Sequence, residues 1–385
     1  MKIKRVLIVL LALIMIAATG CAPGAGNPSD SRPAAPGASQ ASGDPAGSAA
    51  QSADGEILSF PADKKWKIGF AAREIVNDFN RDIIDGAKAV IEAAGGEMVV
   101  VDAGADVGKH NENIENLINS GVDGIIVMLG DQQQLAPMIE KANAANIPVI
   151  TTAVMAQVPG SICDVSGDEM LCSTLTSRML LSSMGYQGDL YVFWVPGATL
   201  LEQRKRALDA LLVDFPQVNV IEVPTEHNPA KVQSQMEDIL TANSDTGSIG
   251  GVWAAYDQLG TGAYQAIMQA GRSEIKMASM DGDKIAFQMM YAENSPFVAS
   301  GGENIRLMGT IAGESMVKVA NGRADEIAGA MYTSAYAITR HNGIEAAKVR
   351  FDEATIWDEL GLDKEEIITK YPQTDDLYLV RPLAP

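Results

Sequence analysis

The stretch SGVDGIIVMLGDQQQLAPMIEKANAANIPVITT, residues 120–152, decides the fold. Residues 124–128 form a short unbroken apolar run, which is typical of a strand buried on both faces of a parallel sheet. The segment 133–145 predicts a helix, and the apolar run 146–151 predicts the next strand. Strand, helix and strand in this order predict a βαβ unit whose helix covers one face of a parallel sheet.

The same unit recurs on both sides of this stretch. Before it, strands are predicted over 66–72 and 97–102, and helices over about 80–94 and 109–119. The pattern restarts at residue 188, with strands over 188–194, 218–223, 251–255, 275–280 and 297–301 and helices over about 199–214, 229–240, 260–270, 283–291 and 306–319. The chain is therefore expected to be an α/β protein with two doubly wound parallel-sheet lobes.

Residues 1–21 predict an export signal. Lys2, Lys4 and Arg5 precede an apolar run over 6–18, which at 1.5 Å per residue covers about 20 Å, less than the ~30 Å hydrocarbon core of a membrane. The run leads into Ala-Thr-Gly-Cys at 18–21, which resembles the bacterial lipobox, in which the cysteine becomes the acylated first residue. We expect a lipidated Cys21, with ordinary signal cleavage beside an unmodified Cys21 as the alternative.

Residues 22–56 predict a flexible tether. They consist almost wholly of Ala, Gly, Ser, Pro, Asp, Asn and Gln, and such a composition buries too little apolar surface to offset its ordering entropy. The remaining chain exceeds the usual size of one domain, in agreement with two lobes.

Charge and motifs exclude several functions. The formal net charge of −20 excludes nucleic acid and an anionic membrane surface as partners, so membrane contact is expected only through the lipid anchor. The sequence has no Gly-x-Ser-x-Gly, no phosphate-binding Gly-rich loop and no His-Glu-x-x-His, so neither an enzyme nor a cofactor is expected. The histidines are scattered and no Cys-x-x-Cys occurs, so no metal site is expected. For Cys163 and Cys172, a disulfide and two buried free thiols both remain open.

Several short motifs together carry a family resemblance. They are Lys-Ile-Gly-Phe at 67–70 with Asn77 and Phe79 behind it, Asp-Gly-Ala-Lys at 85–88, the segments 120–127 and 142–151, and Met-Asp-Gly at 280–282. In this order and spacing, residues 66 to about 326 resemble the type 1 periplasmic solute-binding proteins of ABC transporters, in the ribose- and galactose-binding branch.

The resemblance implies a mechanism and a place in the cell. Two lobes joined by three crossover strands close around a small ligand, and the closed form docks on the permease subunits of the transporter. We expect a monomer, anchored in the cell envelope with its folded part outside the cytoplasm. The N-terminal lobe is expected to comprise 57–168 plus about 304–332, and the C-terminal lobe 169–303 plus about 333–385. The resemblance implies no function for the segment after about residue 332.

Two alternatives stay open beside sugar transport, and a third is disfavoured. The same binding event serves a chemoreceptor or a signalling kinase, and the same fold binds nucleosides or furanone signals. Effector domains of lactose-repressor-type transcription factors share the fold, but they carry a basic helix-turn-helix where this chain has a signal peptide.

Candidate ligand contacts lie at the carboxyl ends of the strands, where open α/β sheets bind ligands. For Asp281 the resemblance implies an acceptor of ligand hydroxyls, with a helix N-cap as the alternative; for Phe79 it implies an aromatic plate, with core packing as the alternative. His227 is expected to supply a second aromatic face, with a surface loop as the alternative. The full set is Arg73, Asn77, Phe79, Asn80, Arg204, His227, Tyr256, Asp281 and Glu303.

Departures from the ribose pattern widen the expected ligand class. Ala153 and Val154 replace an Asp-Arg pair, Met128 replaces a polar residue, and Arg73 replaces a small polar one. We expect a sugar or sugar-like polyhydroxylated ligand with an apolar edge, or with a carboxylate or phosphate that Arg73 and Arg204 would meet.

Overall fold

The computed structural model of the protein describes residues 58–375 and residue 377. The expected signal peptide, the expected lipidation site Cys21 and the expected tether lie outside the described residues. Within the described part, none of the helices combines the length and the apolar character that crossing a bilayer requires.

The N-terminal lobe is built on a six-stranded sheet in the order β11-β5-β4-β3-β1-β2, in which every pair is parallel. Its strands are β1 (Lys67–Ala72), β2 (Glu97–Asp102), β3 (Gly124–Met128), β4 (Val149–Thr152), β5 (Asp164–Gly167) and β11 (Ala330–Thr333). Its helices are α1 (Asp78–Ala93), α2 (Val107–Asn119), α3 (Gln132–Ala144) and α9 (Ile305–Ala320).

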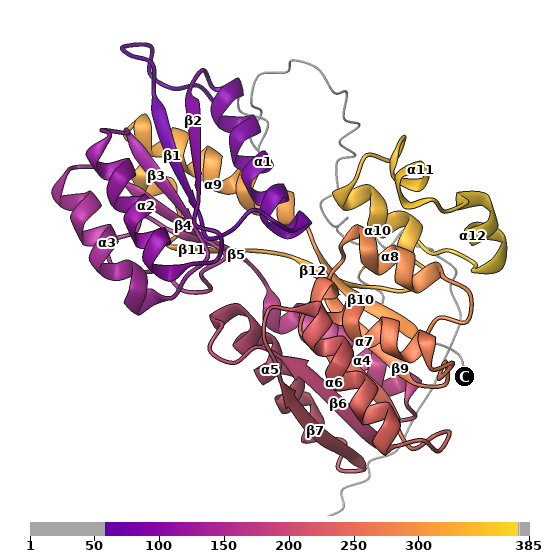
Figure 1. Cartoon of the computed structure of the whole chain (residues 1–385). Coiled ribbons are helices and arrows are strands. Elements are labelled where there is room, and N and C mark those ends of the chain that lie inside the picture. The colour runs from indigo at the N-terminus through magenta and orange to yellow at the C-terminus, as the bar shows by residue number, and fades with distance from the viewer. Residues whose placement is uncertain (1–57, 376, 378–385) are drawn as a thin grey trace, which may run out of the picture. The chain divides into compact units, whose positions relative to one another are not determined.

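Strand β3 explains why residues 124–128 carry no polar side chain. Ile126 and Met128 pack into the core beneath α1 and α9, whereas Ile125 and Val127 pack into the core beneath α2 and α3. Both faces of the sheet are therefore covered, with α1 and α9 on one side and α2 and α3 on the other (Figure 1).

The C-terminal lobe contains the second six-stranded sheet, in the order β12-β10-β9-β8-β6-β7. All its pairs are parallel except β12 with β10. Its strands are β6 (Gly188–Trp194), β7 (Val218–Pro224), β8 (Gly251–Ala254), β9 (Lys276–Asp281), β10 (Phe297–Glu303) and β12 (Ala335–Ile338). Its helices are α4 (Glu169–Ser183), α5 (Thr199–Leu212), α6 (Pro229–Ala242), α7 (Asp257–Gln269) and α8 (Lys284–Tyr291). The two sheets confirm the predicted fold class.

Three segments carry the chain from one sheet to the other: β5 to α4, β10 to α9, and β11 to β12. Two of them touch at Gly167 and Glu303. A Cβ atom at position 167 would overlap the Glu303 carboxylate, so only glycine allows this side chain to lie against the neighbouring crossover.

The C-terminal segment adds α10 (Gly343–Arg350), α11 (Ile356–Leu360) and α12 (Lys364–Lys370) to the C-terminal lobe. Trp357 packs edge-on against Phe287 of α8, and Lys284 of α8 forms an ion pair with Glu359 of α11. The segment is thus part of the core of this lobe (Figure 1).

Several elements were not predicted from the sequence: β5, α4, β11, β12 and α10–α12. Helix α4 was not predicted because Ser173, Thr176 and Ser177 lie on its buried face. These polar residues interrupt the apolar periodicity that marks an ordinary helix. Strand β10 also extends two residues beyond the predicted 297–301. Cys163 and Cys172 are buried free thiols, so the disulfide alternative is wrong.

Candidate functional site

Arg204 is the centre of a buried ionic cluster at the carboxyl edge of the C-terminal sheet. Although it lies on α5, it is only 1% exposed. Its Nε donates to Glu169 Oε2 at 2.5 Å, and its Nη1 lies 2.8 Å from Asp281 Oδ1 and donates to the Ala255 carbonyl at 2.8 Å. A buried guanidinium is tolerated only with such partners, because desolvation of an unpaired charge costs several kcal/mol.

Asp281 is the last residue of β9 and adopts φ = +117°, a value that non-glycine residues rarely take. Backbone strain of this kind clusters at ligand-binding positions. Burial raises the pKa of Asp281, and Arg204 opposes that rise. The N-cap of α8 is Asp283, so the alternative of Asp281 as the helix cap is wrong.

A second ionic group adjoins Asp281. Arg350 of α10 donates Nη1 to the Asp281 carbonyl at 2.6 Å, Nη2 to Asp283 at 2.7 Å and Nε to Asp82 of α1 at 2.7 Å. Asp257, fully buried, accepts from Ser279, Ser300 and the amide of Asp283. Arg350 therefore links the C-terminal segment, the strand end that bears Asp281 and a helix of the N-terminal lobe.

Glu303 is another buried acid of this region, and among the described residues it forms no ion pair. It ends β10 beside β9, where Gly302 pairs with Asp281. It is 2% exposed, and neither carboxylate oxygen has a hydrogen-bond donor; Oε1 of Glu169 also lacks one. Burial raises the pKa of Glu303 well above its ordinary value, and the nearby Glu169 raises it further.

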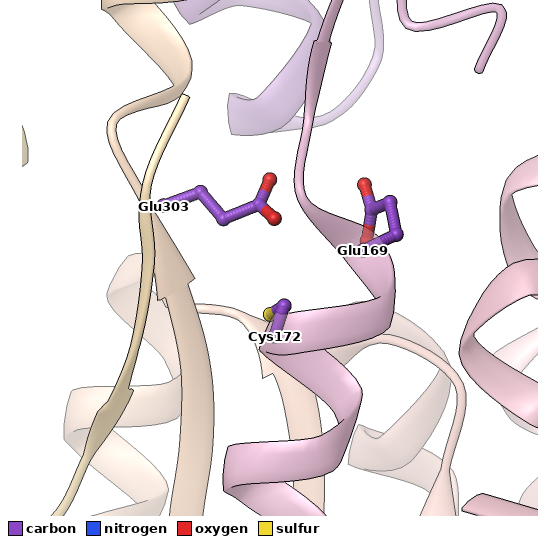
Figure 2. A group of neighbouring side chains, drawn as sticks. All are labelled: Glu169, Cys172 and Glu303. Carbon is purple, nitrogen blue, oxygen red and sulfur yellow. The ribbon is translucent and has the colours of Figure 1, made fainter. Parts of the chain in front are cut away.

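Glu303, Glu169 and the thiol of Cys172 point toward one another (Figure 2), each offering one atom within 4.8 Å of the others. Spacing alone suits a metal ion, but the chemistry of the donors does not. A metal ion would have to displace the thiol proton of Cys172, whose pKa burial raises well above its ordinary value. Arg204 already supplies a permanent positive charge to Glu169. The cluster is better suited to a hydrogen-bond donor than to a metal.

Tyr256 lies next to this cluster, whereas His227 is exposed in the loop between β7 and α6, as the surface-loop alternative expects. The Tyr256 hydroxyl is 3.0 Å from His227 Nδ1, with ring centroids 5.8 Å apart. Burial raises the pKa of Tyr256, and the charge of Asp281 raises it further. Burial lowers the pKa of His227, while Glu74 raises it and Arg73 lowers it. Half-buried Arg73 donates Nε to the Ala105 carbonyl at 2.9 Å.

The predicted residues at the start of α1 take different roles. Asn77 is the N-cap of the helix, and its side chain accepts from the Asn80 amide at 2.9 Å. Phe79 packs into the core of the N-terminal lobe, as the core-packing alternative expects. Asn80 is 1% exposed, and within the part of the chain that the structure describes both polar atoms of its side chain lack a partner, so they are free to hydrogen-bond to a bound molecule.

The positions that depart from the ribose pattern are core positions here. Met128 and Ala153 belong to one apolar core of the N-terminal lobe and Val154 to the other. The loop after β4 thus offers no side-chain hydrogen bond at 153 and 154, as the sequence indicated.

Two residues of the cluster were missed from the sequence. Glu169 was detectable as the first residue of a helix capped by Asp168, because acids are favoured there. Arg350 gave no signal, since it lies in a segment whose short helices have no clear pattern.

A hollow of about 470 Å³ lies elsewhere, at the amino ends of β1, β3 and β4. Its two charged lining residues pair with each other, since Lys64 lies 2.5 Å from Asp123, and Asp123 also accepts from the Lys67 amide at 2.9 Å. The orphaned polar atoms of Asn80, Glu169 and Glu303 therefore favour the opposite edge as the binding site.

Comparisons with known proteins agree with this geometry. A family model described as a periplasmic binding protein domain matches residues 68–324. The ribose import binding protein of Bacillus subtilis (strain 168) is 24% identical over 261 residues, which cover 68% of this chain and 83% of that protein. A xylitol-binding protein of Mycolicibacterium smegmatis is 26% identical over 188 residues, covering 48% of this chain and 53% of that protein, so the chain spans about half its length.

A solved structure of an ABC transporter solute-binding protein from Agrobacterium vitis with bound allitol superposes with a TM-score of 0.67. It is 25% identical, and the match covers 77% of this chain and 98% of that chain. The family resemblance predicted from the sequence is confirmed.

Proposed function

Because this chain belongs to the periplasmic binding protein domain family, we propose that it captures a sugar or sugar-like polyhydroxylated molecule and delivers it to the permease of an ABC transporter. The observation that carries the proposal is the buried Arg204–Asp281 pair at the carboxyl edge of the C-terminal sheet, 2.8 Å apart. A guanidinium and a carboxylate held side by side present donors and acceptors to adjacent hydroxyl groups.

Closure of two lobes explains the chemistry without a covalent step. A ligand that contacts both lobes binds their closed arrangement better and so shifts the population toward it. On the N-terminal lobe, the unpartnered side-chain amide of Asn80 would contact the ligand. On the C-terminal lobe, Asp281 would do so. The ribose, xylitol and allitol named for the relatives support a polyol or sugar as the ligand class.

The N-terminal sequence supports an extracytoplasmic place for this function. The lipobox-like Ala-Thr-Gly-Cys at 18–21 supports lipidation at Cys21, and the polar composition of 22–56 supports a tether between the anchor and the lobes. Under this proposal the protein acts as a monomer that is held at the membrane by its acyl chains.

A ligand-induced melting shift tests the proposal directly. The purified full chain is heated with a panel of sugars, polyols and sugar acids, and at least one member should raise the melting temperature. Asp281→Ala should abolish that shift, whereas the exposed Asp238→Ala on α6 should retain it. If no member of the panel shifts the wild type, the proposed ligand class is wrong; if Asp281→Ala keeps the full shift, the site assignment is wrong.

A further inference from the structure

Carboxyl groups outnumber cations at the proposed binding edge. Glu169, Asp281 and Glu303 are all at least nine-tenths buried, and the guanidinium that pairs with the first two is Arg204. Among residues 58–375 and 377, three acceptor atoms have no donor: both oxygens of Glu303 and Oε1 of Glu169. Figure 2 shows the two glutamates directed toward each other from β10 and α4.

Neighbouring cations do not offset this excess. Arg350 is shared between Asp82 and Asp283. Lys205, next to Arg204 in the chain, forms ion pairs with Asp209 and Glu222 instead. Arg73 donates to a backbone carbonyl, and Glu74 beside it offsets its influence on His227.

Burying a carboxylate without hydrogen-bond donors costs free energy, so we expect the ligand to supply the missing donors. A neutral sugar hydroxyl supplies one donor and no charge. An ammonium group supplies three donors and one positive charge in a compact shape, which suits two convergent glutamates. A metal ion fits less well here, because it would have to displace the thiol proton of Cys172 and would lie beside the guanidinium of Arg204.

We propose that the ligand is an amino sugar or an amino polyol, whose ammonium group is held by Glu303 and Glu169. Arg204 and Asp281 then bind hydroxyls on the neighbouring carbons. This inference rests on the proposed function, because it names the class of ligand that the same site takes. It differs from the option, suggested by Arg73 in the sequence, that the ligand carries a carboxylate or a phosphate.

Matched pairs of ligands test the charge of the ligand separately from its shape. Binding of the purified full chain is measured by calorimetry at pH 7 for D-glucose against D-glucosamine and for D-galactose against D-galactosamine. The N-acetyl derivatives serve as neutral nitrogen-bearing controls. In at least one pair the free amine should bind at least tenfold more tightly than both neutral counterparts.

The variant Glu303→Gln assigns this preference to the cluster. It keeps the shape of the side chain and removes its charge, so the ratio of amine to neutral affinity should fall at least tenfold. The exposed Glu237→Gln on α6 should leave the ratio unchanged. Circular dichroism checks that Glu303→Gln is folded; should it not fold, the wild-type ratio still decides the question.

The outcomes separate the two proposals. Neutral sugars that bind as well as their amines, or a ratio that Glu303→Gln does not alter, overturn the amine proposal and leave sugar binding intact. Failure of both classes to bind, here and in the wider panel above, overturns the proposed function itself.

Discussion

Glu303 and Arg204 illustrate two ways in which one buried side chain is accommodated. Arg204 is satisfied by two carboxylates and a backbone carbonyl, so its burial is compensated within the protein. Glu303 is equally buried, but neither of its oxygens has a donor. Without ligand it must therefore hold a proton or bear the cost of an unpartnered charge.

The pH dependence of stability follows from this difference. The pKa of Glu303 in the folded protein is raised above its ordinary value of 4.5 by burial and by Glu169, against the opposing charge of Arg204; Asp281, Asp168 and Cys172 also face it. An acid whose folded pKa is raised binds protons more strongly in the folded state, so its ionisation costs stability as pH rises above about 4.5. The cost grows until the pH passes the folded pKa.

Glu303→Gln should remove this cost. Its free energy of unfolding in ligand-free protein should exceed that of the wild type by about 1–3 kcal/mol at pH 8. The difference should shrink toward zero near about pH 3, well below the ordinary value of 4.5, because there the wild-type carboxyl is neutral in both the folded and the unfolded state. Urea unfolding at the two pH values measures it, with the exposed Glu237→Gln as the control. A difference that does not change with pH would show that Glu303 does not titrate in this range.

At the scale of elements, the first turn of helix α1 contains both a capping residue and a proposed ligand contact. Asn77 caps the helix through the Asn80 amide, and the side chain of Asn80 is buried and unpartnered two residues into the helix. The resemblance assigned Asn77 to the ligand, whereas the structure shows a capping role.

Replacing Asn77 distinguishes these roles. Asn77→Ala should lower the free energy of unfolding by about 1 kcal/mol, because the helix loses its cap, whereas Asn77→Ser retains a capping oxygen. If the side-chain amide of Asn77 also contacts the ligand, both variants should bind the ligand about tenfold more weakly in calorimetry.

Asp106→Ala is the matched control, since Asp106 caps α2 of the same lobe through the Lys109 amide at 2.6 Å. It should cost about 1 kcal/mol as well, without weakening the binding of ligand. Wild-type affinity in Asn77→Ser would restrict Asn77 to its role as a cap.

The elements also show where sequence reasoning succeeds. Residues 124–128 were predicted as a strand because both faces of β3 are buried, so every position is apolar. Arg204 and Asp281 were named because the family resemblance implies them, and for Asp281 the position at the end of a parallel strand agreed with that resemblance. Strand β5, Asp-Val-Ser-Gly, was missed because its polar side chains are satisfied internally, as in the bond from Ser166 to Asp164 at 2.6 Å. Glu169 follows it directly and was missed with it.

At the scale of the whole molecule, the C-terminal segment has a consequence for both lobes. Arg350 lies beyond the residues 68–324 that match the family, yet it joins Asp82 of α1 to the turn after β9 that carries Asp283. The start of α1 bears Asn77 and Asn80, and the end of β9 bears Asp281. The arginine therefore draws together the two sides of the proposed ligand site.

Removing the Arg350–Asp82 ion pair alone and removing both ion pairs of Arg350 should have different effects. Asp82→Asn removes the contact with the N-terminal lobe while Arg350 keeps Asp283, and the side chain of Asp82 is 20% exposed. Since such a pair contributes up to about 1 kcal/mol, ligand affinity should fall two- to fivefold with little change in the free energy of unfolding. Arg350→Met should in addition lower that free energy by about 3–5 kcal/mol, because it leaves the buried Asp283 without its partner.

Calorimetry for affinity and urea unfolding for stability separate the two effects. Asp85→Asn is the matched control on the exposed side of α1, and it should change neither quantity. The pKa of Asp283 is raised to about 6 by burial despite the opposing charge of Arg350. Without that arginine the pKa should rise further, so the stability of Arg350→Met should recover partly as the pH is lowered and Asp283 takes up a proton. Wild-type affinity in both Asp82→Asn and Arg350→Met would show that the C-terminal segment stabilises its own lobe without coupling the two.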